Sequence, residues 1–130
     1  MFDTVMVPTD GSKCSLKAED VAVFIAKKFN SKLVVVHIVD EKLTDPFDDS
    51  EEEGNTILDK AAHKGKQEGL EVEQILIIGN PVYDMEMIVK KSGADLLVIG
   101  EHGKTGSTEF IGSVAENTLK TVKVPVLLVK

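Results

Sequence analysis

Leu33–Val39 (LVVVHIV) is the stretch that indicates the fold. Successive side chains of a strand point to opposite faces, so this run is apolar on both faces of an extended chain. Such a strand needs cover on both faces, which is typical of a parallel sheet enclosed by helices. The runs Thr4–Pro8 (TVMVP) and Leu96–Ile99 (LLVI) are short, apolar and bounded by turn residues, and they predict two more buried strands.

Two further strands and four helices alternate with these three runs. Val72–Ile78 is interrupted by polar residues and is therefore expected at a sheet edge, and Val124–Val129 is the last strand. Apolar residues at three- and four-residue spacing predict a helix between the first two strands: Ala18, Val21, Ala22, Ile25, Ala26 and Phe29. The expected starts of the other helices are a capping box of Ser50 with Glu53, Asn80 followed by Pro81, and a capping box of Ser113 with Glu116.

This alternation predicts an α/β fold, a doubly wound five-stranded parallel sheet with helices on both faces. Its 130 residues contain no linker or internal repeat, so residues 1–130 are expected to form a single domain. Ligands of such folds bind beyond the carboxyl ends of the strands, where the strand order reverses. The loops after the first and fourth strands are therefore the ones to inspect.

The net charge of −7 is concentrated in one segment. Residues 40–53 hold eight acids and one lysine, so the segment sums to −7, whereas the remaining 14 acids and 14 lysines balance. A balanced body with an acidic patch repels a phosphate backbone, so no nucleic acid is expected as a partner. We expect the acidic segment to be a solvated loop after the second strand, and we hypothesise that it acts as a lid or partner-contact surface.

Several classes of protein are excluded by the remaining composition. No apolar run approaches the ~20 residues of a membrane helix, and the start of the chain does not resemble a signal peptide, so no membrane association is expected. Cys14 is the only cysteine, which rules out an internal disulfide and a cysteine-built metal site. A cytoplasmic location is expected on these grounds.

Pro8-Thr9-Asp10-Gly11-Ser12 is the loop after the first strand. A carboxylate at that position, Asp10, can accept hydrogen bonds from a ribose hydroxyl or an adenine amino group. The alternative is that Asp10 or Ser12 only caps the following helix. On this loop alone the two interpretations stand about even.

The loop after the fourth strand is rich in glycine and runs from Gly100 to Ser113. Glycines allow the backbone to approach a ligand closely, and successive N–H groups with the N-terminus of the last helix can bind phosphate oxygens. The alternative is plain turn geometry. The chain has no arginine, so an anion would rely on these backbone donors and on Lys104. His102 can contact a phosphate or carry a proton, although backbone positioning is the simpler role.

These residues resemble the universal stress protein family. The resemblance covers nearly the whole chain and rests on three runs: VPTDGS at Val7–Ser12, VVVHIVD at Val34–Asp40, and Gly100–Ser113 with the ending VAENTLKTVKVPVLLVK. Nucleotide-binding members carry glycine, two residues, glycine, nine residues, then glycine and serine or threonine. Between Gly103 and Gly112 this chain has eight residues, one fewer than that pattern.

The resemblance implies an adenine nucleotide alpha hydrolase-like, Rossmann-like architecture and a cytoplasmic regulatory protein of the stress response that binds ATP, ADP or AMP, with Mg²⁺ held through the phosphates. It implies that Pro8, Thr9 and Asp10 meet adenine and ribose and that Ile38 lines the adenine. It implies that the ribose and phosphates are held by the following residues: Gly100, His102, Gly103, Gly112, Ser113 and Val114.

The family also dimerises through its last strand, and an exposed apolar edge at Val124–Val129 is an independent reason to expect a homodimer. An unidentified regulatory protein is the other expected partner. Two alternatives to a nucleotide-binding regulator stay open. One is a slow ATP hydrolase or phosphotransferase in which Asp10 or His102 activates water. The other is a nucleotide-free interaction module whose site is closed by the shortened loop.

Overall fold

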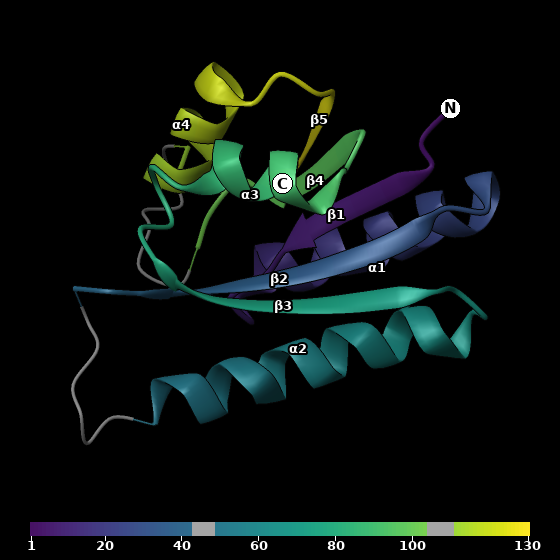
Figure 1. The fold of residues 1–130 in the computed structure, drawn as a ribbon, viewed down its shortest axis with the longest axis horizontal. Coiled ribbons are helices and arrows are strands. Elements are labelled where there is room, and N and C mark those ends of the chain that lie inside the picture. The colour runs from purple at the N-terminus through teal and green to yellow at the C-terminus, as the bar shows by residue number, and fades with distance from the viewer. Residues whose placement is uncertain (43–48, 104–110) are drawn as a thin grey trace.

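The sheet predicted from the sequence is present and confirms the α/β fold. The structure is a computed structural model and describes residues 1–42, 49–103 and 111–130. Five parallel strands lie in the order β3-β2-β1-β4-β5, which places β3 and β5 at the two edges (Figure 1). The elements in chain order are β1 (Thr4–Pro8), α1 (Lys13–Phe29), β2 (Lys32–Asp40), α2 (Ser50–Gln67), β3 (Val72–Gly79), α3 (Met85–Ser92), β4 (Leu96–Gly100), α4 (Ser113–Thr121) and β5 (Val126–Val129).

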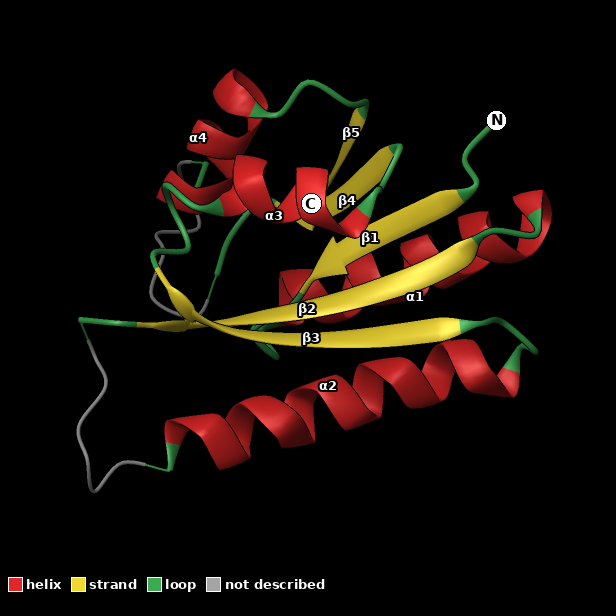
Figure 2. Ribbon diagram, in the orientation of Figure 1, coloured by secondary structure: helices red, strands yellow, loops and turns green. Residues whose placement is uncertain are grey.

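Helices cover both faces of this sheet, α1 and α2 on one side and α3 and α4 on the other (Figure 2). Alternate residues of the central strand divide between the two cores, because Val5 and Val7 pack under α1 and α2 whereas Met6 packs under α3 and α4. All three side chains are fully buried. This is the two-sided cover that strands apolar on both faces require.

The strand order reverses at β1, which pairs with β2 on one side and with β4 on the other. The chain moves outward from β1 through β2 to β3, and then crosses back to β4 and on to β5. The carboxyl ends of β1 and β4 therefore flank the position where open α/β sheets bind ligands. Both of the loops selected from the sequence begin there.

The predicted helix starts at Ser50 and Ser113 are wrong by one residue. Each serine is the first residue inside its helix, and the capping positions are Asp49 and Gly112, neither with a side-chain cap hydrogen bond. The first intrahelical bonds establish this, since Glu53 N donates to Asp49 O (2.8 Å) and Glu116 N donates to Gly112 O (2.9 Å). With Gly112 as the cap, Glu116 is one position too far along α4 to complete a capping box.

Two other boundaries also differ from the prediction. Asn80 behaves as a cap, because its Oδ1 accepts from Val82 N (2.9 Å) and Tyr83 N (3.1 Å), but it caps a separate turn and α3 begins only at Met85. The last strand begins at Val126 rather than at residue 124. It nevertheless lies at the edge of the sheet, as expected.

Candidate functional site

The loops after β1 and β4 meet at the carboxyl edge of the sheet. A methyl group placed on Gly100 would lie 2.9 Å from the backbone carbon of Cys14, so the first turn of α1 packs directly on the end of β4. A methyl group on Gly103 would lie 2.9 Å from Asp10 Oδ2. Ser12 Oγ is 3.5 Å from His102 O. The structure therefore brings together the two loops that the sequence singled out.

Asp10 is held in place by the start of α1. Its Oδ1 accepts hydrogen bonds from Ser12 N (2.9 Å) and Ser15 Oγ (3.0 Å). Ser12 is the residue that caps α1, and its Oγ accepts from Ser15 N (3.4 Å). The capping role thus belongs to Ser12, whereas Asp10 Oδ2 lies next to Gly103 of the loop after β4.

Thr9 is turned inward, unlike its neighbour Asp10. It is 5 % exposed, and its N–H donates to Val36 O (2.8 Å). Its carbonyl accepts from Nδ1 of His37 (2.8 Å), which therefore carries the ring proton at Nδ1. Its hydroxyl donates to Oε2 of Glu19 (2.5 Å). Thr9 thus contributes to the site by fixing the loop, and its side chain points toward α1 and the core.

Backbone hydrogen bonds close the base of the glycine-rich loop. Gly112 N donates to Glu101 O (2.8 Å), and Glu101 N donates to Val129 O (2.8 Å), which extends the pairing of β4 with β5. The amide of Gly112 is therefore used within the protein. The amides of Ser113, Val114 and Ala115 precede the first intrahelical bond of α4 and have no acceptor inside the helix, as at every helix N-terminus.

His102 pairs with its sequence neighbour. Its Nε2 lies 2.9 Å from Glu101 Oε1, and its side chain is 14 % exposed. Nδ1 is buried and has no hydrogen-bond partner among the residues that the structure describes. Glu101 thus orients the ring of His102 at the start of the glycine-rich loop.

Apolar residues expected at the site lie on the α3–α4 side of the sheet. Ile38, opposite Ile77 in the register of β2 with β3, and Val114 in the first turn of α4 are both partly buried against the same core cluster. Pro8, at the end of β1, pairs with Val36 of β2. The carboxyl edge therefore combines a fixed carboxylate with apolar side chains from two elements.

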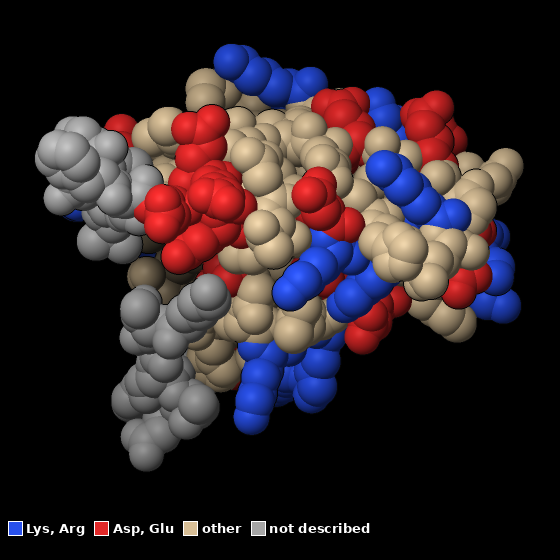
Figure 3. All heavy atoms as spheres, turned by 90° about the horizontal axis from the view of Figure 1, so that it is seen from below, with Lys and Arg blue, Asp and Glu red and all other residues tan. Residues whose placement is uncertain are grey.

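The predictions for Lys104 and for the eight-residue spacing after Gly103 lie outside the described residues, because the structure does not describe 104–110. The same holds for residues 43–48 of the acidic segment. The described acids of that segment include the exposed first turn of α2, Glu51 to Glu53. Figure 3 shows a cluster of acidic side chains on one face of the molecule.

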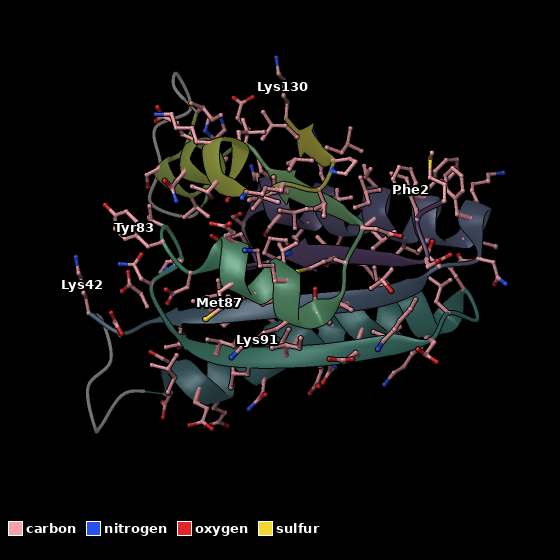
Figure 4. All side chains as sticks on the ribbon, turned by 45° about the horizontal axis from the view of Figure 1, so that its top comes forward. Phe2, Lys42, Tyr83, Met87, Lys91 and Lys130 are labelled. Atoms are coloured by element: carbon pink, nitrogen blue, oxygen red, sulfur yellow. The ribbon has the colours of Figure 1, made fainter. Side chains whose placement is uncertain are left out.

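A third loop at this edge was missed in the sequence. The turn from β3 to α3 is held by Asn80, by Asp84 Oδ2, which accepts from Asn80 N (2.8 Å), and by Asn117 of α4, which donates to Val82 O. This turn presents Tyr83, which is 73 % exposed, at the same end of the molecule as Lys42 (Figure 4). Its signal was the Asn80–Pro81 pair, which indicated a helix start instead of a separate turn.

Glu19 is the second feature that was missed. It is 1 % exposed, and besides Thr9 it pairs with Lys64 Nζ of α2 at 2.9 Å. The buried residues of α1 are Ser15, Ala18, Glu19, Ala22, Val23 and Ala26, so helical spacing alone places Glu19 on the buried face. A hollow of about 650 Å³ lies beside this region, between α1 and α2, and Lys64 lines it together with Phe24.

The comparisons with known proteins agree on one family. The universal stress protein family matches residues 1–130. Universal stress protein MJ0531 of Methanocaldococcus jannaschii is 33 % identical over 141 residues, covering 100 % of this chain and 83 % of that protein. Universal stress protein YxiE of Bacillus subtilis is 30 % identical over 148 residues and is covered completely, as is this chain.

Solved structures give the same result. A universal stress protein in complex with cAMP is 32 % identical, with a TM-score of 0.77 over 99 % of this chain and 97 % of that chain. One from Archaeoglobus fulgidus in complex with dAMP shares the fold at 24 % identity, with a TM-score of 0.79 over 100 % of this chain and 98 % of that one. In the described part of this chain no helix is long and apolar enough to cross a membrane. From the sequence match, the strand order and these relatives together, the chain belongs to the universal stress protein family.

Proposed function

We propose that this protein is a regulatory module that binds an adenine nucleotide at the carboxyl edge of the sheet, between β1 and β4. The observation that carries the proposal is the placement of Asp10, whose Oδ1 is held by Ser12 and Ser15 while Oδ2 faces Gly103 of the opposite loop. A fixed carboxylate at the switch point of a doubly wound sheet is suited to ribose hydroxyls. The relative that was solved with cAMP supports an adenine nucleotide as the ligand class.

Three parts of the site have different tasks in this proposal. Asp10 accepts hydrogen bonds from the ribose. Ile38 and the apolar surface around it lie against the base, because a purine ring buries its faces most favourably on apolar side chains. The amides of Ser113 and Val114, together with the dipole of α4, bind phosphate oxygens.

No arginine is available to neutralise the charge of the bound phosphates. The chain has no arginine, so backbone amides and Lys104 supply the positive potential. The described residues contain no group of three side chains suited to hold a metal. We therefore propose that ATP, if it is the ligand, brings Mg²⁺ bound through its own phosphates.

We further propose that the protein acts as a homodimer through β5. Leu97 N donates to Pro125 O (3.0 Å) and Glu101 N donates to Val129 O (2.8 Å), so these carbonyls face β4. Because alternate residues of a strand direct their amide and carbonyl groups to opposite sides, those of Val126 and Leu128 face the open edge. Antiparallel pairing with β5 of a second copy would satisfy them.

The nucleotide proposal is tested by isothermal titration with AMP, cAMP and ATP, the last with and without Mg²⁺. We expect the variant Asp10→Ala to lower the affinity about ten- to hundredfold, which corresponds to a hydrogen bond to a charged group. The matched control is Asp59→Asn, an exposed carboxylate on α2. Absence of binding by the wild-type protein at millimolar nucleotide would refute the proposal and favour a nucleotide-free interaction module.

The same preparation tests for an enzyme. A binding module releases no phosphate from ATP above the rate of the buffer. Steady phosphate release that is lost in Asp10→Ala or in His102→Ala would instead support the slow hydrolase.

A further inference from the structure

The buried carboxylate of Glu19 is not explained by the contribution of ion pairs to stability. Glu19 is 1 % exposed within the apolar core beneath α1, where Ala18, Ala22 and Val23 surround it on the helix. Removing a charge from water is costly, and replacing a buried ion pair by apolar residues of similar volume is often neutral or stabilising. A carboxylate in this position therefore calls for a role other than holding the core together.

The contacts of Glu19 lead to the candidate nucleotide site. One oxygen, Oε2, accepts the hydroxyl of Thr9 at 2.5 Å, and the other, Oε1, lies 2.9 Å from Lys64 Nζ. Thr9 is followed directly by Asp10, and Thr9 Oγ1 also accepts from Gly11 N (3.3 Å). The hydroxyl proton of Thr9 is directed to the Glu19 carboxyl group, so the lone pairs of Thr9 Oγ1 accept from the backbone of the loop.

Ser15 holds Asp10 by a second, separate contact. Its hydroxyl lies 3.1 Å from Thr9 Oγ1 and donates to Asp10 Oδ1 at 3.0 Å. The loop that carries Asp10 is thus held at two points: Glu19 binds the Thr9 hydroxyl, and Ser15 binds the Asp10 carboxylate. Charge-assisted hydrogen bonds are the strongest members of such networks, so the bond from Thr9 to Glu19 is the principal anchor.

We propose that Glu19 is a positioning residue for nucleotide binding: it holds Thr9, and through Thr9 it holds Asp10 in the orientation that accepts the ribose hydroxyls. Lys64 supplies a countercharge next to this carboxylate, with Nζ 2.9 Å from Oε1. The proposal rests on the proposed function, because it assigns a task to the ribose contact of that site. It differs from a purely structural role in one respect: replacing Glu19 should lower the affinity only for ligands that carry ribose hydroxyls.

Two ligands separate these roles: AMP, and its 2′,3′-dideoxy analogue, which lacks both ribose hydroxyls. In isothermal titration we expect Glu19→Gln and Glu19→Leu to lower the affinity for AMP about five- to tenfold, the value of one hydrogen bond, and to leave the affinity for the analogue within about twofold. The matched control is Asp20→Asn. Asp20 also pairs with Lys64, at 3.1 Å, but its side chain is 71 % exposed and has no described contact with Thr9. Asp20→Asn should leave both affinities unchanged.

A second measurement needs no nucleotide. Hydrogen exchange of the Gly11 and Ser12 amides reports the loop directly, because these amides donate to Thr9 Oγ1 and Asp10 Oδ1. We expect faster exchange in Glu19→Gln and no change in Asp20→Asn. Equal losses of affinity for the two ligands, or unchanged exchange in a folded Glu19→Gln protein, would overturn the positioning role. If the wild-type protein bound neither ligand, the proposed function would fail, and the exchange experiment would still decide whether Glu19 holds the loop.

Discussion

Gly100→Ala adds a single methyl group where the first turn of α1 packs against the end of β4, and it tests how close that packing is. Built on the backbone, that methyl group would lie 2.9 Å from the carbonyl carbon of Cys14, 3.0 Å from Cys14 Cβ and 3.1 Å from Cys14 O. Two of these three atoms are backbone atoms and cannot rotate away. Gly100→Ala must therefore displace the first turn of α1 from the end of β4, or displace the end of β4 itself.

The size of the effect follows from the overlap. Ordinary contacts begin near 3.4 Å, so the backbone has to move by about 0.5 Å, and overpacking of this kind costs about 1–3 kcal/mol. For 130 residues the entropy of unfolding at the midpoint is about 0.27 kcal/mol per kelvin. We therefore expect Gly100→Ala to lower the Tm by about 4–11 °C.

Thermal unfolding followed by circular dichroism measures this shift, with urea unfolding as a second measurement. The matched control is Gly103→Ala, where the methyl group would lie 2.9 Å from Asp10 Oδ2, a side-chain atom rather than a backbone atom. Gly103→Ala should displace the Asp10 carboxylate, weaken nucleotide binding and cost about 1 kcal/mol, the value of one of the hydrogen bonds that hold Asp10, without moving α1 from β4. A Tm for Gly100→Ala equal to that of the wild type would refute the close packing of α1 on β4.

Three further predictions concern the core, the buried ion pair and the sheet edge. Leu58→Ala should lower the free energy of unfolding, measured by urea unfolding, by about 2–5 kcal/mol, because Leu58 lies on the buried face of α2 and is 1 % exposed. A loss below about 1 kcal/mol would contradict that packing. Burial lowers the pKa of Lys64, but its hydrogen bonds with Glu19 and Asp20 together raise it above 10.5. Because the folded pKa exceeds the unfolded one, this stabilisation is present below pH 10.5 and is lost as the pH rises through the folded pKa, so the stability difference between the wild type and Lys64→Gln should be constant below pH 10.5 and shrink above it. Leu127→Glu, on an edge-strand residue that is 40 % exposed, should give a monomeric mass in light scattering where the wild type gives a dimer; a monomeric wild type at micromolar concentration would argue against pairing through β5.

The fold was predictable because it depends on periodic apolar residues. The run at Leu33–Val39 became the interior of β2, whose residues 33–36 are fully buried, and the interrupted run at 72–78 became an edge strand. Helix starts were less predictable. Ser50 and Ser113 have the side chain and spacing of capping residues, but each lies one position inside its helix. For α4 the cap is Gly112, whose N–H donates to Glu101 O, and a contact between residues so far apart in the chain is not visible in a local sequence pattern.

The candidate site shows the same division. Sequence patterns placed Asp10 and Gly103 in loops that the topology brings together. They did not distinguish Asp10, which lies next to Gly103, from Thr9, which faces the core, because the difference depends on Glu19 of α1. A polar residue at a buried position of an amphipathic helix needs a hydrogen-bond partner, and this pattern could have identified Glu19 from the sequence.

The hydrogen bond that joins Glu101 to Gly112 has a consequence for how the chain tolerates insertions and deletions. It fixes the two ends of the segment between them, so a change in the length of that segment is not passed on to β4 or to α4. Closing a loop of this size costs only about 0.1 kcal/mol more for one added residue. A change in the number of residues between Glu101 and Gly112 is therefore expected to leave the pairing of β4 with β5 and the start of α4 unchanged.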